Sequence, residues 1–387
     1  MKRLLPLLEG RATPTTRTAR TTLQVLGGVG HLYGAIMQGR AGLYRRRILP
    51  SFRAPCPVIS VGNLTAGGTG KTPMVLWLAR QLAHGPHRLA IVSRGYGTPA
   101  ASQPGQPEGV TVVADPDGVR IHPPRAADEA ALLARHLPGV TILTGADRAR
   151  LIRFAVTQYG VGLILMDDGF QHLRVQRDLD LVLLDARHPL GNGALLPGGI
   201  LRERPQALHR ADGLVVTRCG DAALFAQASA TLARFAPDKP ILQADHQPTA
   251  WQQPGDAQTL PLSTLADTPV LAFCGIARPD SFARLLAQTR TSVTGWQIFP
   301  DHFAFTRQTL ATLIRQGHAT RAQALVCTAK DAVKIPPAWL EAFTPTLPLF
   351  VLQMEMVFPT APVWLQAQLA TLAGITYSPD AAPRPPA

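Results

Sequence analysis

Cysteine is scarce in this sequence, and no two cysteines form a pair motif. Four cysteines occur in 387 residues, and none belongs to a CxxC motif. This pattern argues against a zinc site or a disulfide framework, and it is typical of a reducing cytosol. Aromatic residues make up only 6% of the chain, and no nucleic-acid-binding module is recognisable. We therefore expect no nucleic-acid partner.

The sequence also lacks an apolar run long enough to predict a membrane span. Its most apolar N-terminal segment is residues 23–37, which read LQVLGGVGHLYGAIM. This segment is short, rich in glycine and without a signal-peptide cleavage site. Four arginines follow it at positions 40, 45, 46 and 47. An apolar segment beside an arginine cluster is typical of a helix lying on an anionic cytoplasmic leaflet, and the alternative is an ordinary packed helix.

Acidic residues are few relative to basic ones. Lys and Arg total 38 against 25 for Asp and Glu, which gives a net charge of +13. Such a surface favours anionic partners, including phosphorylated substrates and anionic membranes. Apolar residues make up 46%, enough for a sizeable core, and the length predicts two or three domains.

A P-loop pattern occupies residues 58–79, which read VISVGNLTAGGTGKTPMVLWLA. A β-rich run leads into a glycine loop ending in Lys71-Thr72, and apolar residues then recur at helical spacing. Glycines let backbone N–H groups approach a phosphate chain, Lys71 can reach its β- and γ-phosphates, and the Thr72 hydroxyl can bind Mg²⁺. The predicted nucleotide-binding residues are Thr65, Ala66, Gly67, Gly68, Thr69, Gly70, Lys71 and Thr72.

One position departs from the standard P-loop. Thr65 stands where the pattern has its first glycine. The alternative interpretation is a glycine-rich β–α turn with a coincidental Lys-Thr pair.

Apolar strands alternate with helical segments along the rest of the chain. This pattern predicts an α/β fold: a P-loop NTPase-like parallel sheet with helices on both faces, plus a smaller second α/β domain. Apolar strand runs are expected at 88–93, 110–114, 140–144, 161–166, 179–184 and 214–217, and a second set begins near residue 270. We predict a membrane-associating segment (1–48), a P-loop core (49–265), a second α/β domain (266–375) and a disordered tail (376–387).

Acidic residues follow one of these strands. Asp167 and Asp168 come directly after the apolar run 161–166, which is where a Walker B carboxylate would hold Mg²⁺. Phosphoryl transfer also needs a group that orients or deprotonates the acceptor hydroxyl. The candidates are Asp128, Glu129, Asp301 and His302, and a loop histidine with a purely structural role is the alternative for His302.

The motifs together resemble those of the lipid A 4'-kinase family (tetraacyldisaccharide 4'-kinase). The P-loop segment 60–73 resembles that family's loop, which has Ser or Thr where the standard pattern has its first glycine. Further similar motifs, in the same order, are Ser93-Arg94-Gly95-Tyr96-Gly97, Asp128-Glu129, Gly145-Ala146-Asp147-Arg148, Asp167-Asp168-Gly169-Phe170-Gln171-His172, Leu201-Arg202-Glu203, Pro300-Asp301-His302-Phe303 and Lys330-Asp331-Ala332-Val333-Lys334. The resemblance runs from about Leu23 to Leu372, with Ala329 standing where the family commonly has Glu.

The resemblance implies an ATP- and Mg²⁺-dependent kinase at the cytoplasmic face of the bacterial inner membrane, anchored by its N-terminal helix. Its lipid substrate would be tetraacyldisaccharide 1-phosphate, phosphorylated at the 4'-hydroxyl to give lipid IVA. By motif, the catalytic pair falls on Asp128 and His302, with Lys71 at the phosphates. The metal residues would be Thr72, Asp167, Asp168 and Glu203, and Arg94 or Arg202 would meet the substrate 1-phosphate.

Two other functions fit parts of the sequence. A P-loop GTPase acting as a metallochaperone or targeting factor would use Thr328-Ala329-Lys330-Asp331 to read guanine, although the usual residue order is not kept. A non-catalytic membrane-surface module is the second, and the intact Lys71-Thr72 and Asp167-Asp168 argue against it. Nucleotide preference, and phosphate release without a lipid acceptor, would separate them from a lipid kinase.

Overall fold

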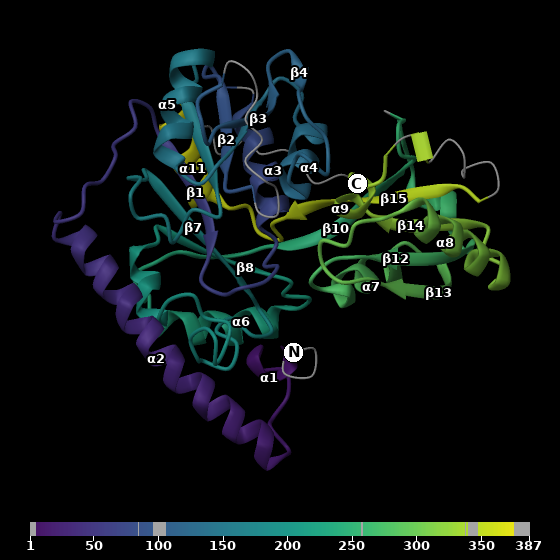
Figure 1. Cartoon of the computed structure of the whole chain (residues 1–387), viewed down its shortest axis with the longest axis horizontal. Coiled ribbons are helices and arrows are strands. Elements are labelled where there is room, and N and C mark those ends of the chain that lie inside the picture. Colours follow the sequence, from purple (N-terminus) through teal and green to yellow (C-terminus); the bar gives the residue numbers. More distant parts are fainter. Residues whose placement is uncertain are drawn as a thin grey trace.

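The computed structural model describes residues 5–83, 85–95, 106–256, 258–336, 338–339 and 347–374. The expected disordered tail, 376–387, lies outside these residues, as do Tyr96 and Gly97 of one motif. The described residues form a nine-stranded sheet and a six-stranded sheet, which lie side by side, while the long helix α2 (Arg17–Arg45) runs along the outside of the first body (Figure 1).

The first sheet has the order β4-β3-β5-β2-β6-β1-β7-β8-β9. Its strands are β1 (Val58–Asn63), β2 (Leu89–Ser93), β3 (Thr111–Asp115), β4 (Gly118–Val119), β5 (Thr141–Thr144), β6 (Leu163–Asp167), β7 (Leu179–Asp185), β8 (Gly213–Thr217) and β9 (Ile241–Gln243). The second sheet has the order β11-β10-β15-β14-β12-β13. Its strands are β10 (Asp245–Gln252), β11 (Thr259–Leu260), β12 (Pro269–Cys274), β13 (Ser292–Ile298), β14 (Ala324–Thr328) and β15 (Leu349–Val357).

The remaining elements are helices. They are α1 (Leu5–Leu8), α2, α3 (Lys71–Leu82), α4 (Asp128–His136), α5 (Arg148–Tyr159), α6 (Ala222–Ala233), α7 (Pro279–Ala287), α8 (Arg307–Ala319), α9 (Ala329–Ala332) and α11 (Val363–Ala373), with 3₁₀ turns η1 (Pro205–Arg210) and η2 (Leu262–Leu265).

The inner part of the first sheet is parallel, as predicted. Neighbouring strands run parallel from β5 through β2, β6, β1, β7 and β8 to β9. Strand β3, by contrast, pairs antiparallel with both β5 and β4. The run 110–114 was expected in a parallel sheet. An apolar run indicates that a strand is buried but not which way it points, so the direction of this edge strand was not predictable.

Both faces of the first sheet are covered. Ile59 and Val61 of β1 pack into one core with residues of α3, α4 and α11, and Val58 packs into another with residues of α5. Successive side chains of a strand point to opposite faces, so an entirely apolar strand requires a cover on each side. Because β1, β6, β7 and β8 run parallel, their carboxyl ends share one edge of the sheet.

The division between the two sheets falls at residues 243–245, not at the expected boundary between 265 and 266. Strand β9 ends the first sheet at Gln243, and β10 enters the second sheet at Asp245, where it pairs antiparallel with β15. The polar sequence of β10, DHQPTAWQ, gives no apolar run that would reveal a strand. Helix α11 also returns to the first body, where Leu365 and Leu369 join its core.

Helix α2 includes the apolar segment 23–37 and continues beyond both of its ends. Thr16 caps its start by accepting a hydrogen bond from Ala19 N at 3.2 Å. Gly30 and Gly34 face the loop at Leu195, where an added Cβ would lie 2.8 Å and 2.3 Å from atoms of that residue. No helix in the described part of the chain combines the length and apolarity needed to cross a membrane.

Candidate active site

The P-loop joins β1 to α3 and contains two glycines with positive φ. Gly67 has φ +109° and Gly70, which precedes α3, has φ +87°, conformations that strongly favour glycine. An added Cβ at Gly70 would also lie 2.9 Å from the imidazole of His246. The chain can therefore turn sharply into α3 and present Lys71 at its first position.

Side chains around the loop bind its carbonyl oxygens. Asn63 Nδ2 donates to Gly67 O at 3.2 Å, Arg218 Nη1 to Gly68 O at 2.7 Å, and Thr217 Oγ1 to Thr69 O at 2.9 Å. These three carbonyls are held by the body of the protein. Carbonyl oxygens that faced a bound phosphate would repel it. Because protein donors hold these three oxygens, the loop is suited to bind phosphate.

Thr65, the residue that departs from the standard pattern, is buried and paired. It forms an isolated antiparallel bridge with Leu201, and the neighbouring Ala66 N donates to Ile200 O at 2.7 Å. The first half of the loop is thus held by the segment that carries Arg202 and Glu203.

Lys71 meets the acidic motif directly. Its Nζ lies 3.0 Å from Asp168 Oδ1, and Arg202 Nη1 lies 2.9 Å and 3.0 Å from the two oxygens of the same carboxylate. Burial would raise the pKa of Asp168, but the two cations outweigh it and hold that pKa below its ordinary value. Asp168 has φ +54°, an uncommon conformation that is often found at functional sites.

Asp167 lies deeper than its neighbour. It is 3% exposed, and its Oδ1 is buried without a hydrogen-bond partner. Burial, followed by the nearby Glu129 carboxylate, raises its pKa from 3.8 to about 7, against the opposing effect of Lys71. A buried carboxylate oxygen without a partner, beside another carboxylate, fits a hard cation such as Mg²⁺.

Asp128 and His302, predicted from their motifs, are brought together by the two domains. Asp128 begins α4 in the first body, and His302 follows β13 in the second. Asp128 Oδ2 lies 3.1 Å from His302 Nδ1. His302 has φ +58°, so this turn also uses an uncommon backbone conformation. The pair has the geometry of a carboxylate oriented by an imidazole.

A lysine links the sequence neighbours of this pair. Lys330 Nζ lies 3.4 Å from Glu129 Oε1 and 3.4 Å from Asp301 Oδ1. Burial would lower its pKa, but the two carboxylates outweigh this effect and raise it. Lys330 therefore remains charged and holds the two domains together beside Asp128 and His302.

Glu203, expected among the metal residues, has a different partner. Both of its oxygens accept hydrogen bonds from Arg210, at 2.9 Å and 3.0 Å, and Arg210 lies over the ring of Phe170. Within the described residues no group of three or more His, Cys, Asp or Glu is arranged to hold a metal ion. The expected set of Asp167, Asp168 and Glu203 is therefore not one cluster here, and the metal role of Glu203 stays a prediction.

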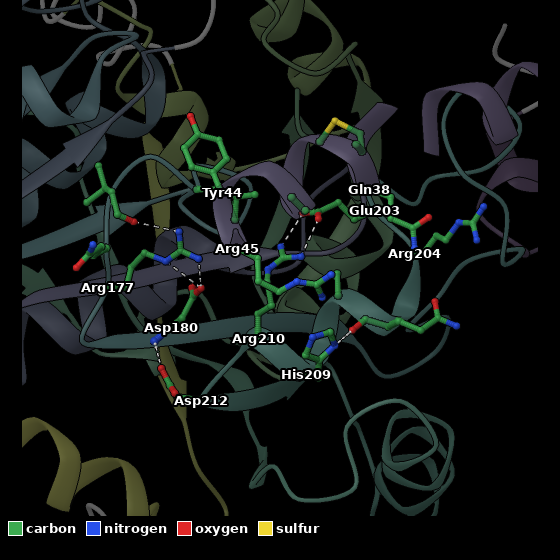
Figure 2. Close-up of a pocket in the computed structure, with 18 of the residues that line it drawn as sticks. Gln38, Tyr44, Arg45, Arg177, Asp180, Glu203, Arg204, His209, Arg210 and Asp212 are labelled. Carbon is green, nitrogen blue, oxygen red and sulfur yellow. Dashed lines mark hydrogen bonds and ion pairs between the residues drawn. The ribbon is translucent and has the colours of Figure 1, made fainter. Parts of the chain in front are cut away.

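Glu203 and Arg210 instead line a cavity of about 620 Å³ between α2 and η1 (Figure 2). A second ion pair, Arg177–Asp180 at 2.7 Å, lies on another wall of it. Outside this cavity, Arg40 of α2 donates to Gln171 O at 3.1 Å. Helix α2 is thus attached to the acidic motif itself.

The two arginines expected to meet the substrate phosphate differ in their surroundings. Arg94 follows β2 and is exposed at the carboxyl edge of the sheet. Arg202 is committed to Asp168, and it also lies 3.4 Å from Gln171 Oε1. Both arginines stay candidates for the substrate phosphate, and Arg202 is in addition part of the acidic motif.

The guanine-reading alternative finds no support at Asp331. This residue is fully buried, and its Oδ2 accepts hydrogen bonds from Gly275 N at 3.0 Å and from Thr328 Oγ1 at 2.6 Å. It belongs to the core of the second domain, so its carboxylate is occupied by the protein rather than offered to a base.

Arg218 is a site residue that the sequence did not single out. It follows β8, adopts φ +59°, and ties the P-loop carbonyl of Gly68 to Asp185 Oδ2, 2.8 Å away. Its position in the sheet could have identified it. Arg218 follows β8, a buried parallel strand that pairs with β7, and β7 pairs in turn with the P-loop strand β1.

The sequence of this chain is similar to those of known proteins. The family model "Tetraacyldisaccharide-1-P 4'-kinase" matches residues 22–372. A tetraacyldisaccharide 4'-kinase from Anaeromyxobacter dehalogenans (strain 2CP-C) is 43% identical over 301 residues, covering 77% of this chain and 78% of that protein. Another, from Anaeromyxobacter sp. (strain K), is 40% identical over 349 residues and covers 90% of each.

A solved structure agrees with these sequence relatives. The crystal structure of LpxK from Aquifex aeolicus in complex with ATP is 27% identical, with a TM-score of 0.72, and the match covers 91% of this chain and 99% of that one. The match to the family model over residues 22–372, together with relatives of this identity and coverage, shows that the chain belongs to the tetraacyldisaccharide-1-P 4'-kinase family.

Proposed function

We propose that this chain transfers the γ-phosphate of ATP to the 4'-hydroxyl of tetraacyldisaccharide 1-phosphate, giving lipid IVA. The observation that carries this proposal is the convergence of a P-loop lysine, a doubled acidic motif and an Asp–His pair at one domain interface. The acidic motif contacts the lysine, with Lys71 Nζ 3.0 Å from Asp168 Oδ1, and the charge of Glu129, the neighbour of Asp128, acts on Asp167. Family membership supports the same substrate class.

In this proposal, ATP occupies residues 65–72, with its phosphates against the loop amides and Lys71 Nζ. Thr72, Asp167 and Asp168 would hold Mg²⁺, which neutralises phosphate charge when bound. Asp168 keeps Lys71 in place before nucleotide arrives, since the two form an ion pair at 3.0 Å. The lysine then exchanges this partner for the phosphates.

Asp128 would accept the proton of the 4'-hydroxyl. His302 orients the Asp128 carboxylate through the 3.1 Å contact. Asp128 and His302 come from different domains, so the catalytic unit is assembled only when the two domains are together. Closing the domains would also exclude water from the transferring group. Arg94 would bind the substrate 1-phosphate, where a guanidinium can donate two parallel hydrogen bonds.

We also infer that α2 attaches the enzyme to the cytoplasmic face of the inner membrane. Its most exposed large apolar side chains are Val25 (64%), Val29 (51%), Leu32 (65%) and Ile36 (62%). Their spacing puts them on one stripe of the helix, opposite to Gly30 and Gly34, which face the protein. The arginines that follow would meet anionic head groups.

The test is a transfer assay with radiolabelled ATP and tetraacyldisaccharide 1-phosphate in mixed micelles. We expect label in the lipid product and no comparable phosphate release without the lipid. Phosphate release that is independent of lipid, or a preference for GTP, would favour a nucleotide-switch protein instead.

A further inference from the structure

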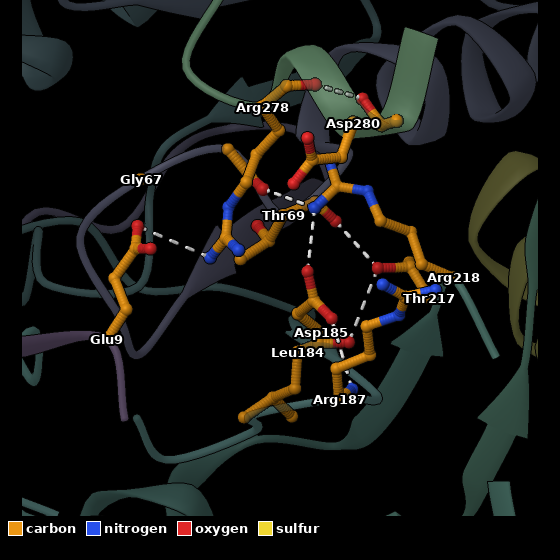
Figure 3. A network of polar contacts seen from close by, with 12 residues as sticks. Glu9, Gly67, Thr69, Leu184, Asp185, Arg187, Thr217, Arg218, Arg278 and Asp280 are labelled. Carbon is orange, nitrogen blue, oxygen red and sulfur yellow. Dashed lines mark hydrogen bonds and ion pairs between the residues drawn. The ribbon is translucent and has the colours of Figure 1, made fainter. Parts of the chain in front are cut away.

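A short N-terminal segment, residues 5–12, contacts both domains, and we call it the N-terminal strap. The family model begins to match the chain at residue 22, so the strap lies outside the part that the chain shares with that model. It contains α1 and the turn that follows, in which Arg11 N donates to Pro6 O at 2.8 Å. Figure 3 shows Glu9 of the strap and Arg278 of the second domain pointing toward each other beside the P-loop.

The strap is seated on the first domain by two glycines. Gly10 has φ +73°, and an added Cβ there would lie 2.8 Å from the backbone C and O atoms of Gly191. Gly191 has φ +57°, and an added Cβ there would lie 2.5 Å from the side chain of Ile200 and 3.4 Å from Leu8 O. Glycine at both positions therefore lets the backbone of the strap approach the first domain this closely.

Glu9 and Arg11 connect the strap to the second domain. Arg278 Nη2 lies 3.6 Å from Glu9 Oε1, and Arg11 Nη1 lies 3.8 Å from Asp280 Oδ2. Arg11 Nε also lies 3.0 Å from Glu9 Oε2, so the two strap residues form one unit. The side chains of Glu9 and Arg278 are 9% and 13% exposed, whereas that of Asp280 is 78% exposed. The Glu9–Arg278 pair is therefore the stronger link, because buried charges are screened less than exposed ones.

The strap spans a cavity that borders the phosphate loop. This cavity has a volume of about 220 Å³, and its lining includes Arg218 of the first domain, Arg278 and Arg284 of the second, and Arg11 of the strap. Arg218 Nη1 donates to Gly68 O at 2.7 Å, so the cavity adjoins the loop itself. The strap is thus placed where separation of the two domains would open the space beside the P-loop.

The covalent connections between the domains leave room for such a motion. The chain passes from the first domain to the second at residues 243–245 and returns between β15 and α11. These two crossings are adjacent, because Asp245 pairs with Val357 in the ladder between β10 and β15. Adjacent connections of this kind can act as a hinge. The strap joins the domains at a separate place, through side chains.

We propose that the N-terminal strap restrains the separation of the two domains and thereby slows the release of nucleotide from the P-loop. The proposal rests on the proposed function, because it takes residues 65–72 as the phosphate site. Opening the cavity breaks the Glu9–Arg278 pair and leaves the buried Glu9 carboxylate without its partner in the second domain, which is more costly than breaking an exposed pair. The same restraint favours the arrangement in which His302 meets Asp128.

The experiment measures nucleotide release and domain separation in the full chain. Stopped-flow fluorescence follows the dissociation of a fluorescent ATP analogue during a chase with excess ATP. Electron spin resonance measures the distance between the domains, with spin labels on cysteines that replace the exposed Gln158 of α5 and Gln308 of α8. The labelled chain carries Cys56→Ser, because the other three cysteines are buried.

Two independent changes loosen the strap. Glu9→Gln combined with Arg11→Gln removes its charges, and Gly10→Val removes its close fit to the first domain. The matched control is Asp267→Asn, which removes a carboxylate that lies 3.6 Å from Arg290, the same distance as in the Glu9–Arg278 pair but within the second domain.

We expect both strap variants to release the analogue about threefold to tenfold faster and to show longer distances between the labels, while the control changes the release rate less than twofold. Unchanged release in both strap variants would overturn the proposal. Faster release with unchanged distances would overturn it as well, since the strap would then act on nucleotide without restraining the domains. If the wild-type chain does not bind the analogue, the P-loop assignment fails, and the distances in the nucleotide-free protein still test the restraint separately.

Discussion

His302 Nδ1 lies 3.1 Å from Asp128 Oδ2, although 174 positions separate the two residues in the chain. The two residues come from different domains. Asp128 begins α4, and His302 lies in the turn that follows β13. The contact therefore forms only when the two domains are together.

Replacing Asp128 or His302 by Ala should slow transfer, because a positioned base and its orienting partner act in the chemical step. We expect a loss of about a hundredfold or more in kcat for Asp128→Ala, with little change in ATP affinity. The double variant should lose less than the product of the single losses, since the residues act as one unit. Losses that multiply fully, measured by single-turnover kinetics, would contradict the pairing.

Lys330→Met should lower kcat about tenfold while the KM for ATP stays within twofold. The lysine bridges Glu129 and Asp301, the neighbours of the catalytic pair, so its loss lets the pair separate. Lys330→Arg should recover part of the rate, because it retains the positive charge. Arg290→Met in the same domain is the control, and an equal loss there would show a general effect on the domain.

Lys71→Ala should reduce transfer by at least about a hundredfold, because it removes the charge that meets the transferring phosphate. Lys71→Arg should not restore full activity, since the fork of a guanidinium does not reproduce a compact ammonium. Turnover near the wild-type rate in the alanine variant would rule out this residue as the phosphate lysine.

Asp167 makes the stability of the nucleotide- and metal-free protein depend on pH. Its pKa is about 7 in the folded chain against 3.8 for the ordinary group. The folded protein thus binds the extra proton, so the contribution of this carboxyl to stability is highest at low pH and falls as pH rises from about 4 to 7. Asp167→Asn should remove this loss.

Urea unfolding in EDTA measures the effect. Relative to wild type, Asp167→Asn should be more stable at pH 8 than at pH 5 by roughly 2–3 kcal/mol. A difference that is the same at both pH values would show that Asp167 does not titrate in this range. Added Mg²⁺ should reduce the advantage of the variant at pH 8, because the cation stabilises the ionised wild-type carboxylate.

Replacing the exposed stripe Val25, Val29, Leu32 and Ile36 by Gln should weaken binding to vesicles of phosphatidylglycerol and phosphatidylcholine. Each buried apolar side chain contributes on the order of 1.5–3 kcal/mol, so the loss should exceed a hundredfold. A control variant changes four exposed apolar residues elsewhere, Val119, Ile298, Met354 and Val363, to Gln. Equal loss in both variants would mean that α2 is not the attachment site, while ATP affinity should be unchanged in each.

Local sequence was sufficient for much of the first domain. Gly67 and Gly70 of the P-loop have positive φ, which favours glycine, and the glycine-rich pattern in the sequence indicated this loop. Strands β1, β6 and β7 are buried along their whole length and are largely apolar, so their apolar runs alone located them. Asp167 and Asp168 could be placed at the edge of the sheet for the same reason.

Other features depended on partners that are distant in sequence. The polar strand β10 exists because β15 offers it a ladder of hydrogen bonds, so the boundary between the domains could not be read locally. Glu203 accepts hydrogen bonds from Arg210 on both of its carboxylate oxygens. Nothing in the spacing of Glu203 distinguishes a metal ligand from the partner of an arginine.

The sequence by itself determined the phosphate loop, the parallel sheet and the residue types needed for phosphoryl transfer, because these follow from local backbone geometry and periodic burial. Only the tertiary structure decided that Asp128 meets His302, that Lys330 spans the two domains beside them, and that Arg187, Arg218 and Arg284 surround one cavity. Those relationships arise where the two domains pack against each other. Their energies depend on distances between side chains that no local pattern specifies.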